Sequence, residues 1–204
     1  MDKPVYVLGG AVWINLANTI HMQNKEKVDE LADPLTARAW LSANLPLLSA
    51  ETGRRPELLQ PLLGELASIR EICLEVLSDL GSRGELSESV LARIEAQAAE
   101  VTLTLKLQRD DKEPPALAYA GKTLTDHARY EVLSSIFDTL GSVPADRIRK
   151  CEHTGCILHF VDTSKSGKRR WCSMELCGNR HKAAEFYAKR KKGAPAATGP
   201  LPDD

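Results

Sequence analysis

Four of the five cysteines in this chain of 204 residues fall within 27 residues near its C-terminal end. Cys151, Cys156, Cys172 and Cys177 follow the pattern C-x4-C-x15-C-x4-C. Two equal pairs, joined by a linker long enough for a β-hairpin, are typical of tetrahedral Zn²⁺ sites in which each pair forms one knuckle. Because four thiolates leave no coordination position for water or substrate, we expect one structural zinc ion.

The size of the cysteine-bearing segment also favours a metal. A module of about 45 residues buries too little apolar surface to be stable without a metal or disulfides. Disulfides are rare in the cytoplasm. We expect a cytoplasmic protein, because the N-terminal MDKPVYVLGGAVW does not resemble a signal peptide and no apolar run reaches the roughly 20 residues that cross a bilayer.

Three other residues of metal-binding type are not needed for this site. His153 lies between the first two cysteines and could replace one of them as a ligand. His159 lies in the apolar, strand-like ILHFVD, and four cysteines already complete the shell. Cys73 stands alone at an apolar position of a helical pattern, where a cysteine is usually a small core residue.

A net charge of −1 conceals a strong division of charge along the chain. Residues 147–192 hold 13 basic and four acidic residues, a net charge of +9, whereas residues 1–146 hold 14 basic and 22 acidic residues, a net charge of −8. This asymmetry indicates a polyanionic partner for the basic segment, with a merely solvated surface as the alternative. The candidate phosphate contacts are Lys165, Lys168, Arg169, Arg170, Lys182, Lys189, Arg190, Lys191 and Lys192.

The order of patterns in this segment predicts the shape of the module. ILHFVD is predicted to be a strand and TSKSGK a turn that leads back through RRW to the second cysteine pair. CGNRHKAAEFYAKRKK is predicted to be an amphipathic helix whose apolar face, including Phe186 and Tyr187, packs on that hairpin. The result is a treble-clef-like module, with a zinc ribbon as the alternative.

Four residues are expected to support the metal site. Arg180 lies in the apolar arc of the predicted helix, so we expect it to be buried or half-buried, bonded to Asp162 or to carbonyl groups of the knuckles. Trp171, beside a ligand, is expected to anchor the core of the module, and Asn179 to cap a helix or form a turn.

The residues WCSMELCGNR, 171–180, resemble the CGNR zinc finger, which is named after its CGNR tetrapeptide. Proteins of this family usually carry an N-terminal ABATE domain, and the front of this chain resembles one in WINLANTI and LADPLTARAWL. The resemblance implies a bacterial transcriptional regulator linked to stress responses. Its finger would bind DNA, and its front domain would sense a ligand or recruit a partner. RNA binding is also implied for the family.

The front of the chain, residues 1–146, is predicted to be a mainly helical α+β domain. Asp33 as N-cap and Pro34 in the first turn begin one helix. A long helix is predicted from about residue 61 to 80, ending at Gly81, and Ser87 is predicted to cap the next.

A β-hairpin is predicted next, formed by VTLTLKLQ and PPALAYA, with a helix after it capped by Thr123 or Thr125. The whole chain is therefore predicted to be an α+β protein with an ABATE-like domain at 1–146, a zinc module at 147–192 and a disordered tail at 193–204.

No catalytic motif stands out: G-x-S-x-G, a phosphate-binding glycine loop and H-E-x-x-H are all missing, so we expect no enzyme. Asn18, Thr19 and Arg70 could line a pocket for a small-molecule effector, with capping and surface roles as the alternative. The favoured hypothesis is a DNA-binding regulator whose front domain senses a ligand or forms a homodimer. The alternatives are RNA binding, docking on an acidic protein partner, and an enzyme in the front domain.

Overall fold

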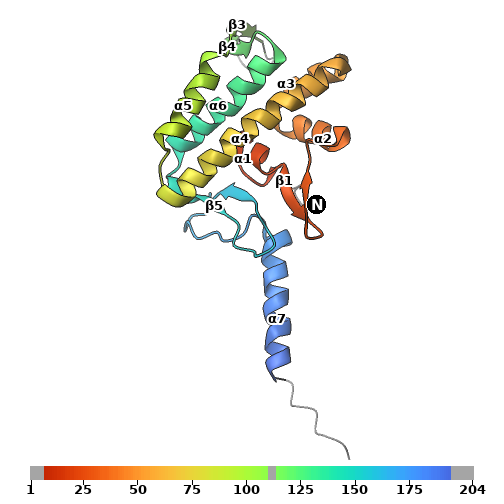
Figure 1. Cartoon of the computed structure of the whole chain (residues 1–204), viewed down its shortest axis with the longest axis vertical. Coiled ribbons are helices and arrows are strands. Elements are labelled where there is room, and N and C mark those ends of the chain that lie inside the picture. Colours follow the sequence, from red (N-terminus) through yellow and green to blue (C-terminus); the bar gives the residue numbers. More distant parts are fainter. Residues whose placement is uncertain (1–6, 110–113, 194–204) are drawn as a thin grey trace, which may run out of the picture.

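The computed structural model describes residues 7–109 and 114–193 of the chain. A bundle of helices forms the front domain, the cysteine-rich module covers one end of the bundle, and the last helix projects away from it (Figure 1). The helices are α1 (Val12–Ala17), α2 (Pro34–Asn44), α3 (Pro46–Arg54), α4 (Leu59–Arg83), α5 (Glu88–Ala99), α6 (Leu124–Ser142) and α7 (Asn179–Gly193).

The described residues also form three antiparallel two-stranded sheets, and together with the helices they confirm the predicted α+β fold class. They pair β1 (Ile20–Gln23) with β2 (Glu26–Asp29), β3 (Leu103–Gln108) with β4 (Ala116–Gly121), and β5 (Ile148–Lys150) with β6 (His159–Val161). Short helical turns are η2 (Pro56–Leu58), η3 (Ala145–Arg147) and the π-helical η4 (Met174–Gly178). None of the helices among the described residues is both long and apolar enough to pass through a membrane.

The core of the front domain lies where α1 and α6 pack on the 25-residue helix α4. Two tryptophans are completely buried there, and both indole N–H groups have acceptors: Trp13 donates to Thr139 Oγ1 at 3.0 Å, and Trp40 donates to the carbonyl of Asn15 at 3.0 Å. Cys73 is also fully buried, and burial raises the pKa of its thiol. It is a core residue, as predicted.

Local capping explains where the helices begin. Asp33 accepts hydrogen bonds from the backbone N–H groups of Leu35 and Thr36, and Ser87 accepts one from Val90. Thr123 and Asp126 form a reciprocal capping box at the start of α6. These predicted starts are confirmed, with Thr123 rather than Thr125 as the cap.

The predicted end of the long helix is wrong. Gly81 lies inside α4, which continues to Arg83. The cap is Gly84, whose φ of +77° lies in the left-handed region that glycine adopts without strain. Both glycines fit the sequence pattern, and only the backbone conformation separates them.

The strand in ILHFVD is confirmed as β6, but its predicted partner is wrong. β6 pairs with β5, which precedes the first cysteine pair, so that Lys150 lies opposite His159. Residues 162–171 form a loop instead of a returning strand. The β1–β2 hairpin was not predicted; its turn is made by Asn24 and Lys25, both with positive φ.

The β5–β6 hairpin joins the cysteine-rich module to the front domain. Ile148 of β5 and Val161 of β6 belong to the core of the front domain. Phe160, the residue before Val161, belongs to the cluster around the cysteines. Asn18, 2% exposed, holds β6 at both backbone groups of His159, donating from Nδ2 to the carbonyl at 2.8 Å and accepting from the N–H at 2.9 Å. The predicted domains at 1–146 and 147–192 therefore share a packed junction.

Candidate zinc centre and its basic surface

The structure brings the four predicted ligands together. The Sγ atoms of Cys151, Cys156, Cys172 and Cys177 all lie within 4.8 Å of one another, with Cys156–Cys172 at 3.8 Å and Cys172–Cys177 at 3.6 Å. Tetrahedral zinc with arms of about 2.3 Å places its sulfurs roughly 3.8 Å apart. Three of these cysteines are buried and Cys156 is partly exposed. The donor set therefore fits zinc.

The chain near each cysteine is fixed by its own backbone. Cys156 N–H bonds to the carbonyl of His153 at 2.9 Å, which closes the first knuckle. Cys172 N–H points to Cys151 Sγ at 3.5 Å and links the two pairs. His153 uses its Nδ1 to accept from the Gly155 N–H, which agrees with a site that does not need this histidine.

The second pair leads into a helix, as the treble-clef-like prediction requires, but the predicted hairpin between the two pairs is not formed. Ser173 begins η4 by accepting from the backbone N–H of Leu176, and η4 carries Cys177 directly into α7. Gly178 of the CGNR tetrapeptide lies tightly packed, because a Cβ at this position would approach Met174 Sδ to 2.5 Å. A larger residue would force the end of the Met174 side chain to move.

The closeness of the four thiols opposes the ionisation of all of them. Hydrogen bonds from Cys156 and Cys172 lower the pKa of Cys151. Burial, followed by the negative charge of the neighbouring Cys156 and Cys151 thiolates, raises the pKa of Cys177 to about 12. A divalent ion would supply the positive charge that four thiolates need.

Arg169 performs the bracing role that was predicted for Arg180. Its Nε donates to the carbonyl of Trp171 at 2.9 Å, and its Nη2 donates to the carbonyl of Cys172. Its guanidinium also lies over the ring of Phe160, 4.3 Å from the centroid. The prediction that Arg169 contacts phosphate is therefore not supported by its position, since its donors serve the metal-binding loop.

The predicted burial of Arg180 is wrong. Arg180 is exposed, and it has no hydrogen bond or ion pair with any residue in the described part of the chain. Asp162, its expected partner, is 1% exposed and accepts instead from the backbone N–H groups of Ser164 and Arg169, each at 2.9 Å. The burial of Arg180 was predicted because its helix was expected to pack on a hairpin of the zinc module, and this packing is not formed.

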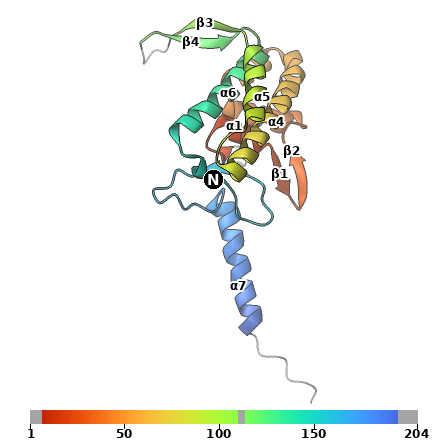
Figure 2. The ribbon, with the colours of Figure 1, turned by 60° about the vertical axis from the view of Figure 1, so that its left-hand side comes forward.

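Helix α7 packs on little beyond its own beginning. Residues 182–190 are all exposed, and Phe186 and Tyr187 are 57% and 68% exposed. The predicted apolar face therefore contacts no hairpin, and Figure 2 shows α7 extending away from the body. Helical periodicity identified the helix but could not show that nothing covers it.

Trp171 and Asn179 lie where the chain turns into α7. The Trp171 ring is half-buried against the cysteine cluster, between His181 at 4.7 Å and the guanidinium of Arg170 at 4.7 Å. Asn179 is exposed and stands at the junction of η4 and α7. The supporting roles of both residues stay predictions.

The remaining basic candidates fall on two surfaces, the loop after β6 and helix α7. Arg170, the most constrained of them, pairs with Glu152, with Nε 2.6 Å from the carboxylate. The side chains of Lys191 and Lys192 lie outside the described residues. So does the predicted disordered tail at 193–204, except for Gly193, which is the last residue of α7. The exposed candidates are Lys165, Lys168, Arg170, Lys182, Lys189 and Arg190.

Two arginines with a structural role were not singled out from the sequence. Arg147 donates to the carbonyls of Asp162 and Ser164, and Arg149 donates to those of Gly167 and Arg169. They fasten the loop that follows β6. Sequence spacing cannot predict such contacts, because their acceptors are backbone groups of an irregular loop.

The three residues considered for an effector pocket are bonded within the protein. Asn18 holds β6, as described above. Arg70 donates to Thr19 Oγ1 at 2.8 Å and forms a two-bonded ion pair with Asp29 at 2.6 and 2.7 Å. Their polar groups thus serve the fold, and the hypothesis of a ligand at Asn18, Thr19 and Arg70 is not supported.

Two family models match the chain. The ABATE model, described as "Putative stress-induced transcription regulator", matches residues 10–142, and the CGNR zinc finger model matches residues 147–190. No curated protein matches the chain. The first match covers well over half of the chain, and the second includes all four clustered cysteines. The chain therefore belongs to the ABATE family and carries a CGNR zinc finger behind its ABATE domain.

Proposed function

We propose that this chain is a cytoplasmic transcriptional regulator, not an enzyme, that binds DNA through the basic surface of its zinc finger. One zinc ion, held by the four cysteines, would be structural, because no ligand position would remain for chemistry. The front domain would sense an effector or form a homodimer. The observation that carries the proposal is the exposure of Lys182, Lys189 and Arg190 on a helix with almost no other contacts.

The dimensions of α7 suit double-stranded DNA. An α-helix fits the major groove, which is about 12 Å wide in B-DNA, whereas the major groove of RNA duplexes is deep and narrow. A helix of 15 residues spans roughly 22 Å. Lys165 and Lys168, exposed on the loop after β6, supply further cations within the same module. These features favour DNA over duplex RNA.

A protein partner is the second candidate, favoured by the exposed aromatic pair on α7. Phe186 and Tyr187 lie in edge contact, with ring centroids 5.8 Å apart. Exposed aromatic side chains are enriched at protein interfaces. An acidic protein segment could therefore bind the same helix through charge and aromatic contacts together.

The test is a binding titration of the full zinc-loaded chain with duplex DNA, duplex RNA and a polyglutamate peptide at several salt concentrations. We expect DNA to bind most tightly. If about five phosphates are neutralised, log affinity should fall against log salt with a slope of roughly −4 to −5. Tightest binding to polyglutamate, or affinity for DNA that does not change with salt, would contradict the proposal.

A further inference from the structure

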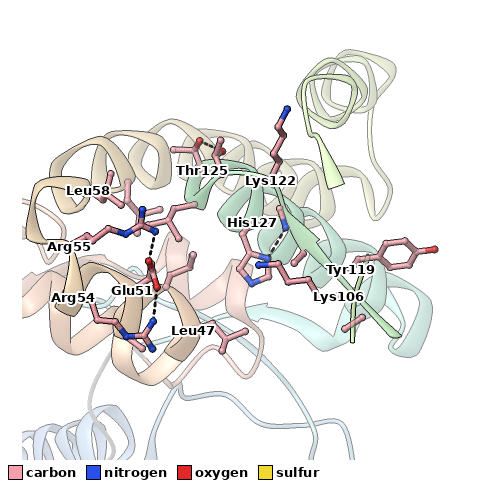
Figure 3. Close-up of a pocket in the computed structure, with 18 of the residues that line it drawn as sticks. Leu47, Glu51, Arg54, Arg55, Leu58, Lys106, Tyr119, Lys122, Thr125 and His127 are labelled. Carbon is pink, nitrogen blue, oxygen red and sulfur yellow. Dashed lines mark hydrogen bonds and ion pairs between the residues drawn. The ribbon is translucent and has the colours of Figure 1, made fainter. Parts of the chain in front are cut away.

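An open pocket of about 810 Å³ lies in the front domain between α3, the start of α4, the β3–β4 hairpin and the start of α6 (Figure 3). It is at the end of the molecule opposite α7 (Figures 1 and 2). Its volume is in the range of small-molecule sites. Buried leucines, Leu48 and Leu62, form part of its floor, and Ala118 and Ala120 of β4 present small side chains to it.

The rim of this pocket is basic although the domain around it is acidic. Arg54, Arg55, Lys106 and Lys122 all line it, against one acidic residue, Glu51, among the described lining residues. Residues 1–146 carry a net charge of −8. Four cations around one opening in such a domain are therefore not explained by average composition.

The charges on the two sides of the opening differ in how far they are neutralised. Glu51 pairs with both Arg54, at 2.8 Å, and Arg55, so this side keeps one net positive charge. Lys106 and Lys122 form no ion pair with any described residue. Figure 3 shows Arg54 and Arg55 on one side of the space and Lys106 on the other, so basic side chains face it from two sides.

His127 also lines the pocket. Its Nδ1 accepts a hydrogen bond from the Gly121 N–H at 3.3 Å, and its Nε2 lies 3.7 Å from a carboxylate oxygen of Glu131. The end of β4 packs tightly against the start of α6 beside the pocket, since a Cβ on Gly121 would come within 2.0 Å of the His127 backbone nitrogen. The start of α6 is already capped by Thr123 and Asp126, so a bound anion would rely on the side chains of the rim.

We propose that this pocket binds an amphipathic organic anion, with a carboxylate head between Arg55 and Lys106 and an apolar body on the leucine and alanine floor. Arginine forks match carboxylates in shape as well as charge. The binding itself does not depend on the proposed function; the use of the pocket as an effector site does.

The proposal is tested by calorimetric titration of the full chain with three matched probes: 4-phenylbutyrate, 4-phenylbutanol and 4-phenylbutylamine. We expect one saturable site for the carboxylate, at least about tenfold tighter than for the alcohol, and no measurable binding of the amine. Similar affinities for all three probes would overturn the proposal, because the basic rim would then have no effect.

Two kinds of variant locate the site. Lys106→Gln should weaken binding of 4-phenylbutyrate about three- to fivefold, as expected for an exposed charge, whereas the control Lys27→Gln on the exposed β2 strand should leave it unchanged. Ala118→Phe should fill the pocket and abolish binding while the far-UV circular dichroism stays unchanged. Unaltered affinity in both Lys106→Gln and a correctly folded Ala118→Phe would overturn the assignment.

The same proteins separate this proposal from the proposed function. Lys106→Gln should bind DNA as well as the unchanged chain does. If the chain binds 4-phenylbutyrate at this pocket but does not bind DNA, the pocket assignment stands and the regulatory function fails. If it binds DNA but none of the probes, the pocket assignment fails alone.

Discussion

Three arginines in and around the loop after β6 and the basic residues of helix α7 use their side chains in opposite ways. In and around the loop, Arg147, Arg149 and Arg169 donate to backbone carbonyls. On α7, Arg180, Lys182, Lys189 and Arg190 are exposed to solvent. A helix satisfies its own carbonyls, whereas an irregular loop leaves carbonyls without partners, and arginine has five donors to meet them. A run of basic residues therefore becomes a binding surface only where the backbone does not need its donors.

The largest effect should come from removal of the metal. Because so small a module depends on its metal, a chelator or Cys172→Ser should unfold the zinc finger, with a loss of about 10 kcal/mol or more of metal-binding free energy. The front domain should stay folded and keep its helical circular dichroism. Retention of the finger's tertiary signal, followed by nuclear magnetic resonance, without metal would contradict the role given to the four cysteines.

The stabilising role of the arginines that donate to backbone carbonyls is tested by Arg169→Ala. This change leaves the carbonyls of Trp171 and Cys172 without donors, so we expect a loss of about 2–3 kcal/mol of stability and faster release of zinc to a chelator. Arg180→Ala, on an exposed position, should stay within about 0.5 kcal/mol of the unchanged protein. Thermal and denaturant unfolding measure both variants, and the opposite order would restore the sequence-based assignment of Arg180.

The junction between the two regions is tested by Asn18→Ala. The change removes both hydrogen bonds to the backbone of His159, and we expect a loss of about 1–3 kcal/mol. The midpoint of unfolding in denaturant, followed by tryptophan fluorescence, should decrease. It should approach, or fall below, the denaturant concentration at which zinc is released. Thr125→Ala, near the opposite end of the domain, is a control that should leave the two transitions as they are.

A smaller effect is expected from pH through Asp162. Burial alone would raise the pKa of this carboxyl, but hydrogen bonds from Ser164 and Arg169 outweigh burial, so the folded pKa lies below the usual aspartate value. The stability contributed by the carboxylate is then fully present above the unfolded pKa, about 3.9, and is lost as pH falls through the lower folded pKa. Asp162→Asn should therefore be less stable than the unchanged chain at pH 6, and the difference should shrink towards pH 3. A constant difference would show that the charge of Asp162 is irrelevant.

Local chemistry made much of this molecule predictable. The cysteine spacing identified the metal-binding residues because a tetrahedral site restricts the number and kind of its ligands. Helix starts at Pro34, Glu88 and Leu124 followed from side chains that cap within three residues. The β3–β4 hairpin followed from alternating apolar residues on both sides of a charged turn.

The features that were missed depend on contacts between distant parts of the chain. Arg169 and Arg180 have the same side chain, and only the position of the carbonyls around Trp171 decides which one turns inward. The strand β5 has three residues and no pattern of its own. The pocket at Arg55 and Lys106 joins segments about 50 residues apart, so no local signal could have indicated it.

The central claim is that the exposed basic residues of α7, unlike the arginines bonded to backbone carbonyls, contact DNA. The most direct test compares the salt dependence of DNA binding among variants. Lys182→Gln, Lys189→Gln and Arg190→Gln, combined, should reduce the salt slope of DNA binding by about 2.7, because each lost phosphate contact contributes roughly 0.9. The front-domain combination Lys25→Gln, Lys27→Gln and Arg83→Gln, which removes the same charge from exposed positions, should leave the slope unchanged. Equal slopes for both combinations would show that α7 does not contact the nucleic acid, and the central claim would be wrong.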